Sequence, residues 1–262
     1  MPAPDVFADW LSTNIANDHK FGRKVYRYHP RSDEHSKTLC RLVLTDLLDA
    51  CSLMRAHAVQ MKIVAGINAP YTDQNGKPKT RDLAIGTPHP NAVLAPTKVS
   101  PICEAMIGRV LFSMEAKQCM TEHSKTKPRL FDELSSSHQI VHAGDPDAIA
   151  AGIVVVNIAD RFASPTRQIS ADGPPLFITH KQPAVTESMV KHLQGLKIRD
   201  LKSGIGSGLG FDAFAILIID CDNTGPCALY TNPPAPQIGQ SHHYETFIKR
   251  ITQAYEARFS GL

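Results

Sequence analysis

Residues 109–118, Arg-Val-Leu-Phe-Ser-Met-Glu-Ala-Lys-Gln, form the stretch that decides the fold. This apolar run ends in an acid and a base two positions apart, and it predicts a strand over residues 109–117. Side chains alternate between the two faces of a strand, so Glu115 and Lys117 are expected on one face. Asp82 lies upstream in a second strand-like segment, residues 80–86. The sequence therefore predicts two carboxylates and a lysine on neighbouring strands.

The segments around this pair predict a mixed sheet flanked by helices, an α/β fold. Residues 61–69 and 79–85 are expected to be strands joined by a turn at 73–78, which contains the hairpin dipeptide Asn-Gly. One long helix is expected before them, and a helix and a strand buried on both faces are expected after residue 117. These last three elements are placed at residues 34–58, 125–141 and 150–158.

The rest of the chain predicts further helices, one more buried strand and two loops. Thr186 is expected to cap the helix that follows it. The helices are placed at residues 5–17, 186–196 and 241–259, the strand at 211–220, loops at 86–97 and 164–175, and a short helix or turn at 99–106.

Composition describes an ordinary soluble globular protein, with 42% hydrophobic and 20% charged residues among 262. No apolar run approaches the roughly 20 residues that span a bilayer. Residues 1–10 include Asp5 and Asp9 and lack the basic-then-apolar pattern of a signal peptide. We therefore expect a cytoplasmic location and no membrane partner.

The net charge of +3 is too small to indicate a nucleic-acid-binding protein by itself. Residues 20–31, however, hold five Lys or Arg, one His, three aromatic residues and no acid. Such a segment could contact phosphates while its aromatic rings pack or stack. A solvated surface loop is the alternative.

The acid–base pattern indicates metal-dependent hydrolysis of phosphodiester bonds. Mg²⁺ prefers oxygen ligands, and Asp82, Glu115 and the carbonyl of Ala116 could supply them. The metal would polarise the phosphate and activate a bound water. Lys117 would either deprotonate that water, which requires a lowered pKa, or stabilise charge in the transition state. Glu-x-Lys is a common tripeptide on solvated helices, but charges at the end of an apolar strand are costly without a partner.

Asp82 followed by Glu115-Ala116-Lys117-Gln118 resembles the signature of the PD-(D/E)xK nuclease superfamily, although Arg81 stands where a proline is usual. The resemblance implies a restriction-endonuclease-like αβββαβ core at about residues 34–160. It also implies a single nuclease domain over residues 1–262, whose extension at 161–262 packs on the core or contacts DNA or another subunit.

The same resemblance implies the roles of the site residues. Asp82, Glu115 and Ala116 would bind Mg²⁺, with Mn²⁺ as a substitute, and Lys117 would be the catalytic lysine. Gln118 would position the attacking water or the DNA. Some members add an acid from the first core helix, for which this chain offers Glu34, Asp46 and Asp49.

A closer similarity rests on Phe112-x-x-Glu115-Ala116-Lys117-Gln118 and on His142-Ala143-Gly144. These are similar to effector nucleases of bacterial anti-phage systems that are activated by cyclic oligonucleotides. That similarity implies double-stranded DNA as substrate, a second-messenger pocket, and homotrimers that assemble into hexamers. The alternatives are a type II restriction enzyme, which is commonly a dimer, a repair or recombination nuclease, and a nucleic-acid-binding assembly protein without activity.

Other patterns support weaker hypotheses. Cys221 and Cys227, with His242 and His243, could form the zinc site of a different hydrolase, although buried reduced thiols are the expected state. Residues 204–210 are glycine-rich but lack the Lys-Ser/Thr of a phosphate loop, so a flexible loop is expected. The remaining predictions are core or capping roles for His138 and His142, DNA contact or a polar helix face for Ser135, Ser136 and Ser137, and a helix start at His242 and His243.

Overall fold

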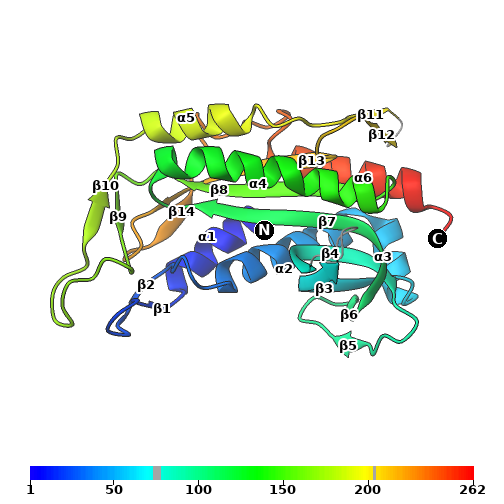
Figure 1. Cartoon of the computed structure of the whole chain (residues 1–262), viewed down its shortest axis with the longest axis horizontal. Coiled ribbons are helices and arrows are strands. Elements are labelled where there is room, and N and C mark those ends of the chain that lie inside the picture. The colour runs from blue at the N-terminus through cyan, green and yellow to red at the C-terminus, as the bar shows by residue number, and fades with distance from the viewer. Residues whose placement is uncertain (73–77, 203–204) are drawn as a thin grey trace.

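A computed structural model describes residues 1–72, 78–202 and 205–262. Within them, the main strands are β3 (Val64–Thr72), β4 (Pro78–Pro88), β5 (Ala95–Pro96), β6 (Cys103–Glu104), β7 (Ile107–Cys119), β8 (Ile149–Asn157), β13 (Ala213–Cys221) and β14 (Cys227–Leu229). They form one mixed sheet in the order β14-β13-β8-β7-β4-β3-β6-β5 (Figure 1). β7, β8 and β13 run parallel, whereas β3, β4 and β7 are joined by antiparallel pairing.

Helices cover both faces of this sheet. One core joins one sheet face to α1 (Ala3–Thr13), α2 (Glu34–Ala50), α3 (Ser52–Val59) and α6 (Tyr244–Phe259). A second core joins the other face to α4 (His123–Gly144) and α5 (Ala184–Leu193). The predicted α/β class, with a large mixed sheet between helices, is confirmed. No helix in the described ranges is long and apolar enough to cross a membrane.

The central strands form where the sequence is continuously apolar. All nine residues of β8 are buried, and in β13 only Asp220 is exposed. Side chains of β8 alternate between the two cores, with Ile153 on the α2 side and Val154 on the α4 side. Burial on both faces therefore accounts for the unbroken apolar runs that predicted these strands.

Small two-stranded sheets lie outside the main sheet. They pair β1 (Ala16–Asn17) with β2 (Lys24–Tyr26), β9 (Arg161–Ala163) with β10 (Phe177–Thr179), and β11 (Asp200–Lys202) with β12 (Ile205–Ser207). The first two pairs lie side by side at one end of the molecule (Figure 1). The amide of His19 donates to the carbonyl of Pro165 at 2.8 Å, and the Tyr26 hydroxyl donates to Gln168 Oε1 at 2.8 Å. We call residues 16–31 together with 161–179 the arm.

Two predicted helices end earlier than their apolar patterns indicated. The helix predicted over residues 34–58 is two helices, because Cys51 has an extended backbone (φ −111°, ψ 98°) and its Sγ accepts the Met54 amide at the start of α3. The helix predicted over residues 5–17 stops at Thr13, because Asn14 is extended (ψ 150°). Neither break carries a Gly or Pro.

The local predictions around the loops are corrected in several places. α5 begins at Ala184, and Thr186 is inside it, where its hydroxyl donates to the carbonyl of Asn157 at 3.1 Å rather than capping the helix. Residues 99–106 contain a turn at residues 100–101, one of the two predicted alternatives, followed by β6. β4 and β5 take part of the loop predicted at 86–97. β12 replaces part of the predicted glycine-rich loop, whereas Gly204 and residues 73–77 of the predicted turn lie outside the described residues. His243 caps α6, as expected for a helix start, by accepting the Glu245 amide.

Candidate active site where two strands separate

Strands β4 and β7 pair only over part of their lengths. Their antiparallel register runs from Pro88 and Ile107 to Leu83 and Met114. Beyond this point β4 pairs with β3 alone, through Arg81 and the residues before it. The next residue on β4 is Asp82, and the next on β7 is Glu115, so both acids lie where the strands separate.

Asp82 compensates for the lost strand pairing. Its Oδ2 accepts the backbone N–H of Ala116 at 2.8 Å. A β7 amide that β4 would otherwise bond is thus satisfied by a carboxylate, which a buried amide requires. The hydrogen bond holds Asp82 beside Glu115 and Ala116, the residues with which the sequence had grouped it.

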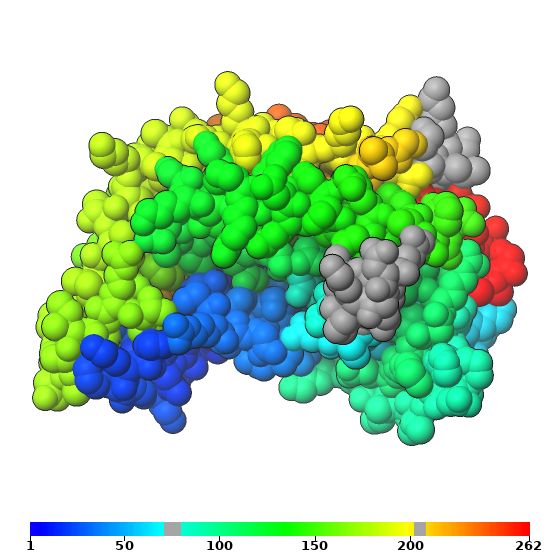
Figure 2. All heavy atoms as spheres, in the orientation of Figure 1, coloured from blue at the N-terminus to red at the C-terminus, as the bar shows by residue number. Residues whose placement is uncertain are grey.

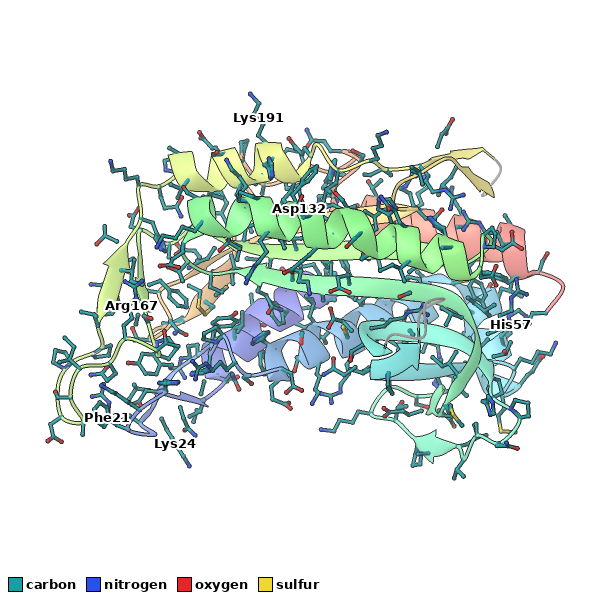
Figure 3. All side chains as sticks on the ribbon, in the orientation of Figure 1. Phe21, Lys24, His57, Asp132, Arg167 and Lys191 are labelled. Carbon is teal, nitrogen blue, oxygen red and sulfur yellow. A yellow bond between two sulfur atoms is a disulfide. The ribbon has the colours of Figure 1, made fainter. Side chains whose placement is uncertain are left out.

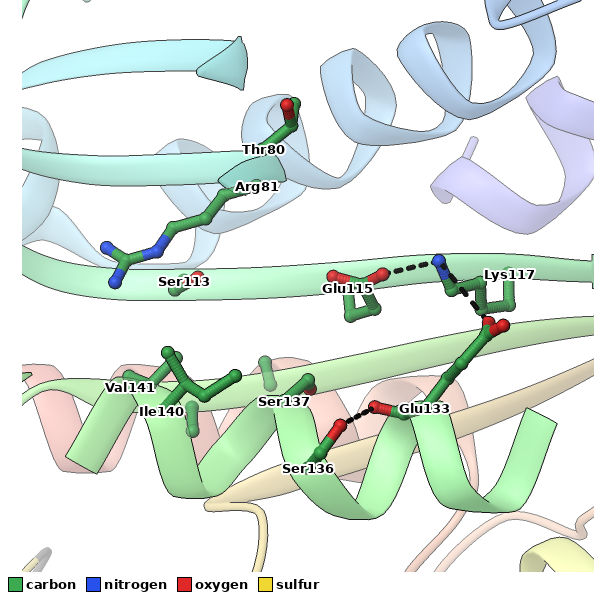
Figure 4. A pocket seen from close by; sticks show the side chains of 12 residues that line it. Thr80, Arg81, Ser113, Glu115, Lys117, Glu133, Ser136, Ser137, Ile140 and Val141 are labelled. Atoms are coloured by element: carbon green, nitrogen blue, oxygen red, sulfur yellow. Dashed lines mark hydrogen bonds and ion pairs between the residues drawn. The ribbon is translucent and has the colours of Figure 1, made fainter. Parts of the chain in front are cut away.

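Glu115 and Lys117 lie on the same face of β7, as predicted. Lys117 Nζ is 2.5 Å from Glu115 Oε1 and 4.0 Å from Glu133 Oε2 of α4 (Figure 4). These three side chains line a cavity of about 240 Å³ between the sheet and α4. The other lining residues are Thr80, Arg81, Ser113, Ser136, Ser137, Ile140, Val141, Ala150 and Ala151.

One face of α4 forms the wall of this cavity. Glu133, Ser136, Ser137, Ile140 and Val141 follow one another at the three- and four-residue spacing that aligns side chains on a helix face (Figure 4). The cavity exists because short side chains of β7 and β8 face the helix here. Of the predicted phosphate-contacting serines, Ser136 and Ser137 therefore lie in the cavity.

The charges in the site influence one another strongly. Burial raises the pKa of Asp82, although the hydrogen bond from Ala116 and the charge of Lys117 oppose this. Burial also raises the pKa of Glu115, and the charge of Asp82 adds to the effect. Burial disfavours the ammonium of Lys117, but Glu115 and Asp82 outweigh it and raise the pKa of Lys117. The neighbouring carboxylates therefore favour the ammonium form of Lys117.

The donor set suits a magnesium ion. Asp82 and Glu115 are two half-buried carboxylates whose mutual repulsion a divalent cation would relieve. In the described parts of the chain no group of three or more His, Cys, Asp or Glu is arranged to hold a metal. Mg²⁺ needs no such cage, because it commonly keeps several waters and binds one or two carboxylates. The Ala116 carbonyl is a further oxygen donor beside Glu115.

Gln118 does not belong to this arrangement. It is absent from the cavity lining, as Asp82 also is, and side-chain alternation places it on the face opposite Lys117. Its Nε2 is buried, with no hydrogen-bond partner among the residues that the structure describes. The role assigned to Gln118, positioning a water or DNA in the site, therefore has no support in this geometry.

The candidate acids of the first core helix do not reach the cavity either. Asp46 Oδ2 accepts the Ala3 amide and the Tyr244 hydroxyl, both at 2.8 Å. Asp49 forms an ion pair with Arg55, and Glu34 lies 3.8 Å from Lys37. The additional acid in the site is instead Glu133 of α4, which no sequence pattern had singled out.

The proposed zinc ligands are engaged elsewhere. Cys221 and Cys227 face each other across β13 and β14 and form a disulfide, which corrects the expectation of reduced thiols. His142 Nε2 lies 3.1 Å from Asp212 Oδ2, and His138 packs edge-on against Phe211 at 5.0 Å. His138 and His142 thus pack in the interior, in agreement with the predicted core or capping role. Of the histidines of the zinc hypothesis, His243 caps α6 and His242 Nδ1 lies 3.0 Å from Ser241 Oγ.

The basic segment at residues 20–31 has some buried and some exposed side chains. Tyr26 and Tyr28 are buried, whereas Lys20, Lys24 and Arg31 are exposed. Phe21 and Lys24 lie at the outer end of the arm (Figure 3), and the arm forms one end of the molecular face that also carries α4 (Figure 2). Arg167 of the arm pairs with Glu122, directly before α4, at 2.7 Å.

Comparison with known proteins does not place the chain in a family. A scan against models of protein families gave no match, and a search of curated proteins found no similar sequence.

Proposed function

We propose that this protein is a Mg²⁺-dependent DNA endonuclease with a restriction-endonuclease-like core. The observation that carries the proposal is the separation of β4 from β7 at Asp82 and Glu115, with Lys117 beside Glu115 in a cavity under α4. Two acids and a lysine are brought together at one point by the fold. A purely structural role would not require two carboxylates and an ammonium to be placed close together in a partly buried position, because burying charges is costly.

The order of elements supports the same core. α2, β3, β4, β7, α4 and β8 follow one another along the chain as helix, three strands, helix and strand, apart from the small strands β5 and β6 and the short helix α3. The order matches the αβββαβ pattern that the sequence resemblance implied. The acids lie on the second and third of its strands.

In this proposal the chain holds the metal and the substrate in defined positions. Asp82, Glu115 and the Ala116 carbonyl bind Mg²⁺, which when bound polarises the phosphate and lowers the pKa of a bound water. Lys117 donates its charged hydrogen bonds to the phosphate oxygens. Ser136 and Ser137 offer hydroxyl donors along the cavity wall.

Double-stranded DNA is the proposed substrate because exposed cations continue away from the site. Lys125 and Arg129 are exposed in the first turns of α4, and Lys127 between them is half-buried. The exposed Lys20 and Lys24 belong to the arm, which lies at the same end of the molecule (Figure 1). Cations distributed from α4 to the arm can contact successive phosphates along the backbone of a DNA strand. The protein would act in defence against foreign DNA, as the resemblance implies.

The test is cleavage of supercoiled plasmid with Mg²⁺, Mn²⁺ or EDTA, each with and without a panel of cyclic oligonucleotides. Glu115→Gln and Asp82→Asn should abolish cutting. Lys117→Met should slow it by about 10²–10³-fold, as removal of an electrostatic stabiliser does. Asp132→Asn changes an exposed acid of α4 outside the cavity and should cut normally.

The pattern of products separates the alternatives. Discrete fragments indicate a type II restriction enzyme, and degradation only with a cyclic oligonucleotide indicates an activated effector. Intact plasmid under every condition, or normal cutting by Glu115→Gln, refutes the proposal.

A further inference from the structure

Lys117 forms an ion pair with a carboxylate oxygen of Glu115, a residue that we propose as a metal ligand. Its Nζ lies 2.5 Å from Glu115 Oε1, within contact distance of a charged hydrogen bond. A cation that approaches Glu115 Oε1 competes with the ammonium for this oxygen, because the two positive charges repel each other at such a short separation. Metal binding to Glu115 is therefore coupled to the position of Lys117.

Glu133 is a second carboxylate within reach of the same ammonium. Its Oε2 is 4.0 Å from Lys117 Nζ, and its Oε1 is 3.5 Å from Arg129 Nε one helical turn earlier. Arg129 thus holds one oxygen while the other faces Lys117 across the cavity (Figure 4). Lysine has a flexible four-carbon side chain, so its Nζ can cross a gap of this size without backbone movement.

We propose that Glu133 is a positioning residue that accepts Lys117 when a divalent cation takes Glu115. This inference rests on the proposed function. The lysine passes from one carboxylate to the other, remains charged, and stays at the cavity beside the substrate. In this arrangement Glu133 does not bind the metal. It lowers the cost of metal binding by giving the displaced ammonium a new partner.

The test measures Mn²⁺ binding to the full chain by titration calorimetry, with the free Mn²⁺ signal in electron paramagnetic resonance as a second readout. Glu133→Gln should weaken Mn²⁺ binding about three- to fivefold, the worth of a partly exposed ion pair. Asp132→Asn removes the same charge from the neighbouring exposed position and serves as the electrostatic control. Lys117→Met should tighten Mn²⁺ binding because it removes the competitor.

The double variant Lys117→Met/Glu133→Gln decides the mechanism. If Glu133 acts through Lys117, adding Glu133→Gln to Lys117→Met changes Mn²⁺ affinity no more than adding Asp132→Asn does. A further loss would make Glu133 a metal ligand and overturn the inference, as would equal affinities of Glu133→Gln and Asp132→Asn in the wild-type background. If Glu115→Gln binds Mn²⁺ as tightly as wild type, the metal site of the proposed function itself fails.

Discussion

Asp212 offers the sharpest test of how the fold holds the site together. Its side chain has no exposed surface and accepts hydrogen bonds from Arg258 at 2.7 Å and from the Ala150 amide at 2.8 Å, and its Oδ2 lies 3.1 Å from His142 Nε2. Arg199 lies 3.6 Å away. These groups connect β8, the last turn of α4 and α6, so the carboxylate helps to hold α4 over the sheet.

The lowered pKa of Asp212 gives the size of its contribution to the free energy of unfolding. Burial alone would raise it, but the bonds from His142 and Arg258 lower it from 3.8 to about 2. A carboxylate whose folded pKa is depressed stabilises the fold above its unfolded pKa and loses this contribution as the pH falls through its folded pKa. The shift corresponds to roughly 2.4 kcal/mol at neutral pH, of which about 1.3 kcal/mol remains at pH 3.

Asp212→Asn should therefore lower the free energy of unfolding at pH 7 by about 3 kcal/mol, because it also leaves buried cations without their counter-charge. Urea unfolding followed by circular dichroism and by the fluorescence of Trp10 would measure this loss at pH 7, 5, 4 and 3. The difference between variant and wild type should shrink by about 1 kcal/mol between pH 5 and pH 3. A loss below about 1 kcal/mol at pH 7, or one that does not change with pH, would refute the reasoning.

Two further predictions address packing and DNA binding. A Cβ on Gly86 would lie 2.0 Å from the Arg109 carbonyl oxygen, so Gly86→Ala should destabilise the protein by about 2 kcal/mol or more in urea unfolding, whereas Gly144→Ala, with nothing within 4 Å, should be neutral. In a Glu115→Gln background, Lys20→Glu/Lys24→Glu should weaken binding of labelled duplex DNA in an anisotropy assay and reduce the salt slope by about 0.9 per lost phosphate contact. Lys191→Glu on α5 should change neither, and an unaltered slope in the arm variant would remove the arm from the DNA interface.

The central strands could be predicted because one physical cause determines them. β8 and β13 are buried on both faces, and a strand in that environment needs an unbroken apolar sequence. The pairing of Glu115 with Lys117 on one face followed from strand alternation. The same alternation places Gln118 on the other face of β7, so the role that the family resemblance implies for this residue stays a prediction without support from the strand geometry.

The remaining features depend on contacts between distant segments. The break at Cys51 comes from an extended backbone at a residue that does not by itself disrupt helices. Glu133 enters the site only because α4 is rotated to face β7, which the helix sequence alone does not specify. Cys221 and Cys227 become partners because β14 pairs with β13 in one particular register. Each of these outcomes is set by tertiary packing rather than local propensity.

Asp82 combines a structural role with the proposed chemical one. Where β4 leaves β7, the Ala116 amide would lack a partner, and the Asp82 carboxylate supplies it at 2.8 Å. Replacing Asp82 with Ala would leave a buried amide unsatisfied, at a cost of about 1–3 kcal/mol, so lost activity could reflect lost structure. Asn keeps an oxygen that can accept this hydrogen bond and removes only the charge. The separation of the strands thus leaves the Ala116 amide to the Asp82 carboxylate, and this hydrogen bond keeps in place one of the two carboxylates that we propose as metal ligands.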